Sequence, residues 1–163
     1  MATGKGRRLS LAPSLFLRLG DAFVSSFCNE ERIVLVRSRK LKVLIVDNEI
    51  EFASTLAERL RLRKIEVETA FSGQEGLAAV SVFHPDVMIL DLRMPDMGGL
   101  EVLAQVKTLA PAIEVILLTG HGSFEDGIAG MELGAFDYLV KPIDLVLLME
   151  KITEAYQKKS QRK

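Results

Sequence analysis

Short runs of apolar residues, many of them β-branched, alternate along this chain with segments whose apolar residues recur at helical spacing. The runs predict strands near residues 42–46, 65–70, 86–90, 113–118 and 136–140. The segments with helical spacing lie near residues 50–63, 73–83, 98–109, 124–132 and 144–158. Because a helix follows each strand, the strands should lie parallel, with helices on both faces of one sheet. The alternation therefore predicts an α/β fold with a doubly wound, five-stranded parallel sheet.

Three of the expected strands, at 42–46, 86–90 and 113–118, are nearly continuous in Val, Ile and Leu. Such strands are typical of parallel sheets that are covered on both faces. Among doubly wound sheets, we expect the flavodoxin-like strand order 2-1-3-4-5. This order opens a crevice between the first and third strands, at their carboxyl ends.

Polar residues that can bind phosphate or a cation follow four of the expected strands. They are Asp47, Asn48 and Glu49 after the first strand, Asp91 after the third, Thr119 after the fourth, and Lys141 with Pro142 after the fifth. The carboxyl ends of parallel strands meet at one edge of the sheet, so these side chains should converge there. Carboxylate oxygens suit a divalent cation, and a lysine suits the oxygens of a phosphoryl group.

Composition and charge argue against several other classes of protein. Of the 21 basic residues, eight lie in residues 1–40 beside three acidic ones, so the rest of the chain is acidic. An acidic body argues against nucleic-acid binding, and no apolar stretch reaches the ~18 residues of a membrane-spanning helix. The single cysteine, Cys28, cannot form an internal disulfide, which favours a cytoplasmic protein. With only two histidines, His84 and His121, a zinc site is not expected.

Residues 1–40 do not share the alternation of strands and helices. We expect them to form a poorly ordered N-terminal extension, residues 41–158 to form the folded domain, and residues 159–163 to be a basic tail. The sequence beyond the last expected helix is too short for a DNA-binding or ATPase domain. We therefore expect the folded domain to stand alone and to act on another protein.

Taken together, the strand-end motifs resemble those of a known signalling domain. The motifs are Asp47-Asn48-Glu49, Asp91-x-x-Met94-Pro95, Thr119-Gly120 and Lys141-Pro142. In this order and at these spacings they resemble the receiver domain of bacterial two-component response regulators, and in particular the stand-alone receivers similar to the chemotaxis regulator. The resemblance covers about residues 41–158.

The resemblance implies a role for each strand-end residue. Asp91 matches the aspartate that accepts a phosphoryl group, and Lys141 matches the lysine that binds the phosphoryl oxygens. Thr119 matches the hydroxyl that approaches the attached group, and Tyr138 matches the aromatic residue that switches with it. The peptide bond between Lys141 and Pro142 matches one that the family usually holds in cis.

The resemblance also implies a Mg²⁺ cofactor. Its ligands would be Asp47, Asn48, Asp91 and the backbone carbonyl of Arg93. The family usually has a second acid where this chain has Asn48. An amide oxygen can still bind the ion but carries no full charge, so we expect weaker binding of Mg²⁺.

The function implied by these matches is that of a signalling switch and not of an enzyme acting on other molecules. A histidine kinase or a phosphotransfer protein would supply the phosphoryl group, and the chain would catalyse only its own phosphoryl transfer and slow autodephosphorylation. Phosphorylation would change the surface made by the helix at 124–132, the strand at 136–140 and the helix at 144–158. A downstream protein would bind that surface, and dimer formation on phosphorylation stays open.

Two alternatives compete with this interpretation. A pseudo-receiver would bind its partners without phosphorylation, and Asn48 is its only support. An aspartyl-phosphate phosphatase also uses an aspartate at a strand end together with Mg²⁺, but it needs a second aspartate two residues later. That position is Arg93 here, which argues strongly against a phosphatase.

Overall fold

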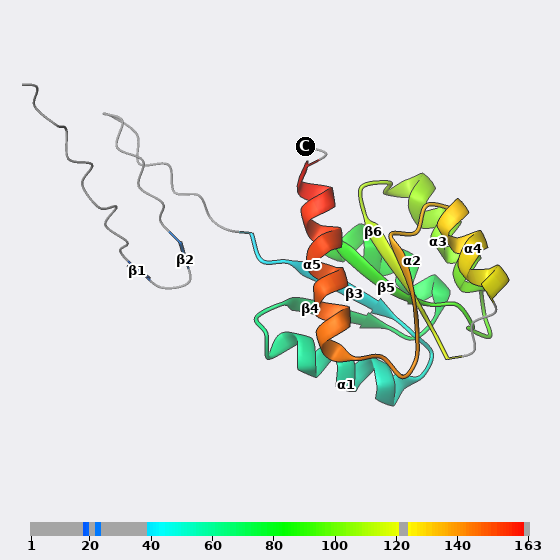
Figure 1. Cartoon of the computed structure of the whole chain (residues 1–163), viewed down its shortest axis with the longest axis horizontal. Helices are drawn as coiled ribbons and strands as arrows, with labels where there is room; N and C mark the ends of the chain where they lie inside the picture. The colour runs from blue at the N-terminus through cyan, green and yellow to red at the C-terminus, as the bar shows by residue number, and fades with distance from the viewer. Residues whose placement is uncertain (1–17, 20–21, 24–38, 121–123, 162–163) are drawn as a thin grey trace, which may run out of the picture. The chain divides into compact units, whose positions relative to one another are not determined.

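Five parallel strands form the central sheet of the domain (Figure 1). They are β3 (Lys42–Val46), β4 (Glu66–Ala70), β5 (Val87–Asp91), β6 (Glu114–Thr119) and β7 (Asp137–Val140). Their order across the sheet is β4-β3-β5-β6-β7, with every neighbouring pair parallel. In order of sequence this is 2-1-3-4-5, so the predicted topology is confirmed.

Helices cover both faces of this sheet, and each face has its own apolar core. The helices are α1 (Ile50–Arg61), α2 (Gly73–Phe83), α3 (Gly99–Leu109), α4 (Phe124–Glu132) and α5 (Leu145–Gln161). One core joins the sheet to α1 and α5, through residues such as Leu60 and Ile152. The other joins the opposite face to α2 and α3, through Val80 and Leu103.

The computed structural model describes residues 18–19, 22–23, 39–120 and 124–161. The chain divides into two units, residues 1–39 and residues 40–163. In the first unit, β1 (Arg18–Leu19) pairs antiparallel with β2 (Ala22–Phe23). Most of the predicted N-terminal extension lies outside the described residues, so its expected disorder stays a prediction. Within the described residues, no helix combines the length and the apolar character that crossing a membrane requires.

Helix α5 continues to Gln161, three residues beyond the end expected from its apolar pattern. Ion pairs at the amino ends of two neighbouring strands explain the difference. Lys159 Nζ lies 2.9 Å from Asp86 Oδ1, and Lys158 Nζ lies 3.4 Å from Glu114 Oε2. Both carboxylates are buried, so an uncompensated charge there would be costly. These contacts therefore favour the helical last turn of α5.

Candidate phosphoacceptor site

The sheet brings two carboxylates together at its carboxyl edge. Strands β3 and β5 are adjacent, with Val46 in register with Leu90, so the next residues, Asp47 and Asp91, lie beside each other. Both side chains are buried: Asp47 is 2 % exposed and Asp91 is 5 % exposed. Backbone amides hold them in place, since Glu49 N donates to Asp47 Oδ1 at 2.8 Å and Arg93 N donates to Asp91 Oδ2 at 2.9 Å.

One lysine neutralises part of this negative charge. Lys141 Nζ lies 2.7 Å from Asp47 Oδ2, 2.8 Å from Glu49 Oε1 and 3.5 Å from Asp91 Oδ1. The ammonium also lies 4.2 Å from the centroid of the Phe52 ring, at a distance that allows a cation–π contact. Three carboxylates therefore share one ammonium, and the cluster keeps a surplus of negative charge.

The neighbouring strands β6 and β7 place Thr119 and Lys141 at the same site. Strand β6 ends at Thr119, which is 1 % exposed, and its carbonyl oxygen accepts a hydrogen bond from Lys141 N at 2.7 Å. The peptide bond between Lys141 and Pro142 is cis, as the family resemblance implies. Four of the residues singled out in the sequence, Asp47, Asp91, Thr119 and Lys141, thus meet at one edge of the sheet.

Burial and charge shift the pKa values of the two central groups. Burial raises the pKa of Asp91 above its ordinary value, and the neighbouring charge of Asp47 raises it further. Lys141 and the Arg93 amide oppose this rise without cancelling it. Burial by itself lowers the pKa of Lys141, but its hydrogen bonds to Asp47 and Glu49 and the charges of both aspartates outweigh burial and raise it. The site is therefore electrostatically unbalanced, with more negative charge than its one cation offsets.

The residues present fit a Mg²⁺ ion. Mg²⁺ keeps several waters and needs only one or two protein carboxylates, which Asp47 and Asp91 supply. Within residues 39–120 and 124–161, no group of three or more His, Cys, Asp or Glu side chains could hold a metal ion. Asn48 lies exposed next to Asp47, and Arg93 lies in the loop after Asp91. The surplus negative charge of the carboxylates would attract a cation to this edge of the sheet.

Comparison with known proteins identifies the family. The sequence model of the response regulator receiver domain matches residues 43–153. The chain belongs to the response regulator receiver family. The receiver is 36% identical to the transcriptional regulatory protein PrrA of Mycobacterium tuberculosis over 111 residues, which is 68% of this chain and 48% of PrrA. It is 34% identical to the regulator ZraR of Salmonella typhimurium over 116 residues, 71% of this chain and 26% of ZraR.

Solved receiver structures match the fold over the same region. The receiver domain protein (CheY-like) from Methanospirillum hungatei has a TM-score of 0.74 and 30% identity, covering 77% of this chain and all of that one (100%). A receiver domain from Clostridium thermocellum has a TM-score of 0.72 and 34% identity, covering 76% of this chain and 99% of that one. The chain spans between about a quarter and a half of the regulators PrrA and ZraR, in which a receiver is one part of a longer protein.

Two contacts of the receiver's lysine were not predicted from the sequence. Glu49 was singled out only as one of the polar residues after the first strand, but its carboxylate contacts Lys141 directly. The Phe52 ring lies next to the same ammonium. Glu49 and Phe52 lie three residues apart at the first turn of α1, so their side chains can lie on the same side of the helix. This spacing is the only feature of the local sequence that indicates a shared contact with Lys141.

Tyr138, the expected switch residue, is half-buried on β7. Its hydroxyl is buried, and within the described part of the chain no hydrogen-bond partner satisfies it. On the neighbouring helix α4, a Cβ at Gly127 would lie 3.3 Å from the ring. The ring also borders an apolar groove of about 540 Å³ that Ile128 and Met131 help to line. The ring of Tyr138 thus lies against helix α4 at the border of this groove.

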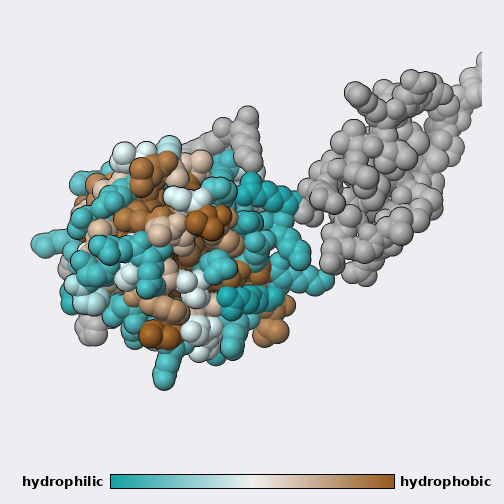
Figure 2. Space-filling view, turned by 180° about the vertical axis from the view of Figure 1, so that it is seen from behind, coloured by the Kyte–Doolittle hydropathy of each residue, from teal (hydrophilic) through white to brown (hydrophobic). Residues whose placement is uncertain are grey.

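Apolar side chains reach the surface around Tyr138 and elsewhere on the domain. On α4, β7 and α5 the large exposed ones are Ile128, Met131, Val140, Val146 and Leu147. The face seen from behind the view of Figure 1 likewise shows apolar residues interspersed with hydrophilic ones (Figure 2). Exposed apolar groups close to the expected switch residue would suit binding to another protein.

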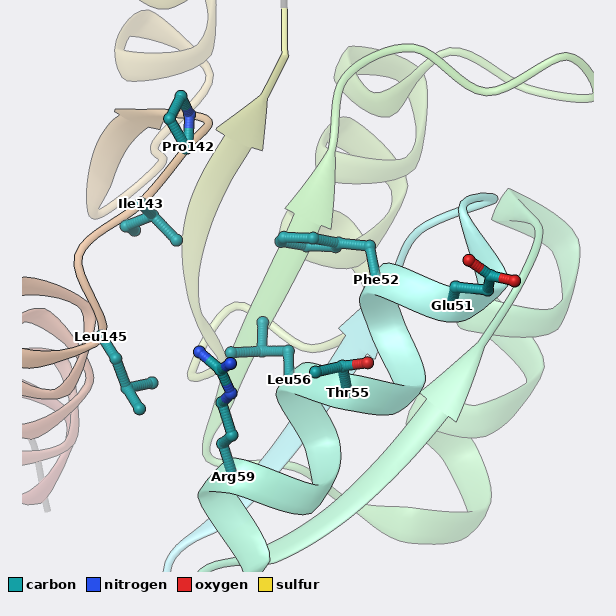
Figure 3. Close-up of a pocket in the computed structure, with 8 residues that line it drawn as sticks. All are labelled: Glu51, Phe52, Thr55, Leu56, Arg59, Pro142, Ile143 and Leu145. Carbon is teal, nitrogen blue, oxygen red and sulfur yellow. The ribbon is translucent and has the colours of Figure 1, made fainter.

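A second groove, of about 370 Å³, lies beside the carboxylate cluster, between α1 and the segment after β7. Figure 3 shows Phe52 and Leu56 of α1 facing Ile143 and Leu145 across it. Arg59 and Glu51 supply charged groups to its lining. Because Phe52 also contacts Lys141, the groove is continuous with the surroundings of the site.

We expect Asn48→Asp to bind Mg²⁺ about tenfold more tightly than the wild type, because the variant adds a full charge near a doubly charged ion. Isothermal titration calorimetry with the unphosphorylated protein measures the change. Asn48→Ala is the matched control, and it should bind more weakly than the wild type because it removes the amide oxygen. Equal affinity in all three proteins would show that residue 48 does not face the ion.

Proposed function

We propose that Asp91 is the phosphoacceptor of this receiver and that a histidine kinase or a phosphotransfer protein is the donor. The observation that carries the proposal is the buried carboxylate at the end of β5, with the ammonium of Lys141 at 3.5 Å. A carboxylate attacks a phosphate group only where positive charge offsets the repulsion between the two anions. Lys141 supplies part of that charge.

In the proposed transfer, an oxygen of Asp91 forms a bond to phosphorus as the bond between phosphorus and the donor breaks. The product is an acyl phosphate on Asp91, and slow attack by water would later remove it. Lys141 exchanges its contact with Glu49 for one with the new phosphoryl oxygens, since both are anions within its reach. Thr119 donates its hydroxyl hydrogen to the same oxygens.

The proposed metal ligands are Asp47, Asn48, Asp91 and the backbone carbonyl of Arg93. When bound, Mg²⁺ would offset the negative charge that Lys141 leaves uncompensated. The groove between α1 and the segment after β7 gives a phosphodonor protein an apolar surface next to the acceptor. We propose this groove as the place where the donor binds.

The test is incubation of the protein with acetyl phosphate, with and without Mg²⁺, followed by mass spectrometry of the intact protein and its peptides. We expect one added phosphoryl group, only with Mg²⁺, on the peptide that contains Asp91. Absence of label with acetyl phosphate and with a phosphohistidine donor would favour the pseudo-receiver, which binds without phosphorylation.

Phosphorylation should also shift a surface away from the acceptor. As Thr119 moves toward the phosphoryl group, space opens for the ring of Tyr138. The equilibrium between two conformations of the face formed by α4, β7 and α5 then shifts. Beryllofluoride with Mg²⁺, which imitates the phosphoryl group, should perturb amide NMR signals around residues 119–145 as well as those around Asp91. Perturbations confined to the loops at Asp47 and Asp91 would mean that no signal leaves the site.

The remaining expectations about the whole protein stay predictions. They are a receiver formed by residues 41–158, an N-terminal extension at 1–40, a basic tail at 159–163, and a cytoplasmic location. The stand-alone arrangement is also a prediction, because PrrA and ZraR are longer than the region they share with this chain. The downstream target would be a protein that binds the α4, β7 and α5 face. Dimer formation on phosphorylation is a further prediction.

A further inference from the structure

The two ends of the loop that follows Asp91 lie close together. Gly99 N, at the first residue of α3, donates to the carbonyl oxygen of Leu92 at 3.0 Å. A Cβ at residue 99 would collide with the carbonyl oxygen of Asp91, so only glycine allows so close an approach. The loop is therefore closed at its base, and Arg93, the proposed carbonyl ligand, lies inside it.

The far side of this loop is bonded to a different element. Both carboxylate oxygens of Asp96 accept hydrogen bonds from the start of α2, Oδ1 from Gly73 N and Oδ2 from Gln74 N, each at 3.2 Å. The next amide, Glu75 N, donates to Ser72 Oγ at 3.1 Å. The amides of the first turn of α2 have no partner within the helix. One of them thus bonds to the capping side chain of Ser72, and two bond to Asp96 in the loop after Asp91.

The charge of Asp96 suits this position, because the first turn of a helix carries a partial positive charge. Burial alone would raise the pKa of Asp96, but the backbone amides of Gly73 and Gln74 outweigh it and hold the pKa below its ordinary value. Asp96 therefore stays ionised and bonded to α2 across the neutral pH range.

Helix α2 also contacts the other side of the metal site. A Cβ at Gly76 would lie 2.9 Å from the side chain of Val46, so α2 packs closely against the end of β3. Val46 immediately precedes Asp47. Through α2, Asp96 thus links the loop after Asp91 to the strand that carries the second proposed carboxylate ligand.

We propose that Asp96 is a positioning residue for the divalent cation. By fastening the loop to α2, it fixes the carbonyl of Arg93 relative to Asp47 and Asp91. This inference rests on the proposed function, because it takes those three residues as ligands. Asp96 does not touch the ion; it acts through the loop, as residues that orient metal ligands do.

The test compares two caps of the same helix. Asp96→Ala removes the bonds between the loop and α2, whereas Ser72→Ala removes a cap of α2 and leaves the loop bonded. We expect the affinity for Mg²⁺, measured by calorimetry on the unphosphorylated protein, to fall about tenfold in Asp96→Ala. In Ser72→Ala it should stay at the wild-type value, although both variants should melt at a lower temperature. Asp96→Asn should restore part of the affinity, because its one amide oxygen can still accept one of the two hydrogen bonds from the helix.

Two outcomes would overturn the proposal. One is an unchanged affinity in Asp96→Ala, and the other is an equal loss in Asp96→Ala and Ser72→Ala, which would show a general effect of a frayed α2. The proposed function is judged separately on the wild type. Wild-type protein that binds Mg²⁺ but takes no label from acetyl phosphate or from a phosphohistidine donor would contradict phosphorylation of Asp91. The Mg²⁺ affinities of the wild type, Asp96→Ala and Ser72→Ala would still decide the role of Asp96.

Discussion

Asp91→Asn should take no phosphoryl group from acetyl phosphate under conditions that label the wild type. The amide has nearly the shape of the carboxylate, so it should keep the hydrogen bond from Arg93 N, but it lacks a nucleophilic anionic oxygen. Asp137→Asn is a suitable control, since that carboxylate pairs with Lys151 at 3.0 Å and should leave labelling intact. Undiminished label on the Asp91→Asn protein would show that another residue is the acceptor.

The same variant should be at least as stable as the wild type at neutral pH. Because the pKa of Asp91 is raised in the folded state, the protonated form stabilises the fold. That stability is fully present below the unfolded value, 3.8, and is lost as the pH rises through the raised folded value. The wild type at neutral pH therefore carries a buried charge that the variant lacks.

Urea unfolding at several pH values in the absence of Mg²⁺ measures this effect. The advantage of Asp91→Asn should be largest near pH 7 and should shrink as the pH falls toward the ordinary pKa of an aspartate. A variant that unfolds at lower urea than the wild type at pH 7 would mean that attraction to Lys141 outweighs burial.

The sequence predicted the sheet and most of the candidate site because both follow from local patterns. Runs such as residues 87–90 are apolar, short and followed by a polar residue, here Asp91, and parallel strands bring their carboxyl ends to one edge. Asp47, Asp91, Thr119 and Lys141 could therefore be assigned to one site without any knowledge of their distances.

Contacts between distant segments could not be predicted in this way. The pairs Lys141–Glu49, Lys159–Asp86 and Gly73–Asp96 are separated by 92, 73 and 23 residues. Hydrophobic periodicity determines which face of an element is buried, but it does not determine which charged side chain meets which. Asp96, for example, lies in a loop sequence that gives no sign of a bond to α2, and the bond appears only once the loop and the helix are packed.

Lys141→Met should lower the free energy of unfolding by about 3 kcal/mol in the absence of metal, because it leaves buried carboxylates without their cation. The side chain of Lys141 is 10 % exposed, and those of Asp47 and Asp91 are 3 % and 6 % exposed, so water replaces the lost charge poorly. Methionine keeps an apolar side chain beside Phe52, which separates the loss of charge from a loss of packing. Lys151→Met is the control, since Lys151 pairs with Asp137 and Glu154 at the surface and should contribute little.

Mg²⁺ should restore much of the stability that Lys141→Met loses, and it should stabilise this variant more than the wild type. Removing the ammonium leaves the carboxylates more negative, so a divalent cation bound among them gains attraction. Urea unfolding of the variant and the wild type over a range of Mg²⁺ concentrations gives the comparison, with Ca²⁺-free and chelator-treated samples as the reference. If Mg²⁺ stabilised both proteins equally, Lys141 and the ion would not share the same carboxylates, and the metal site would have to lie elsewhere on the domain.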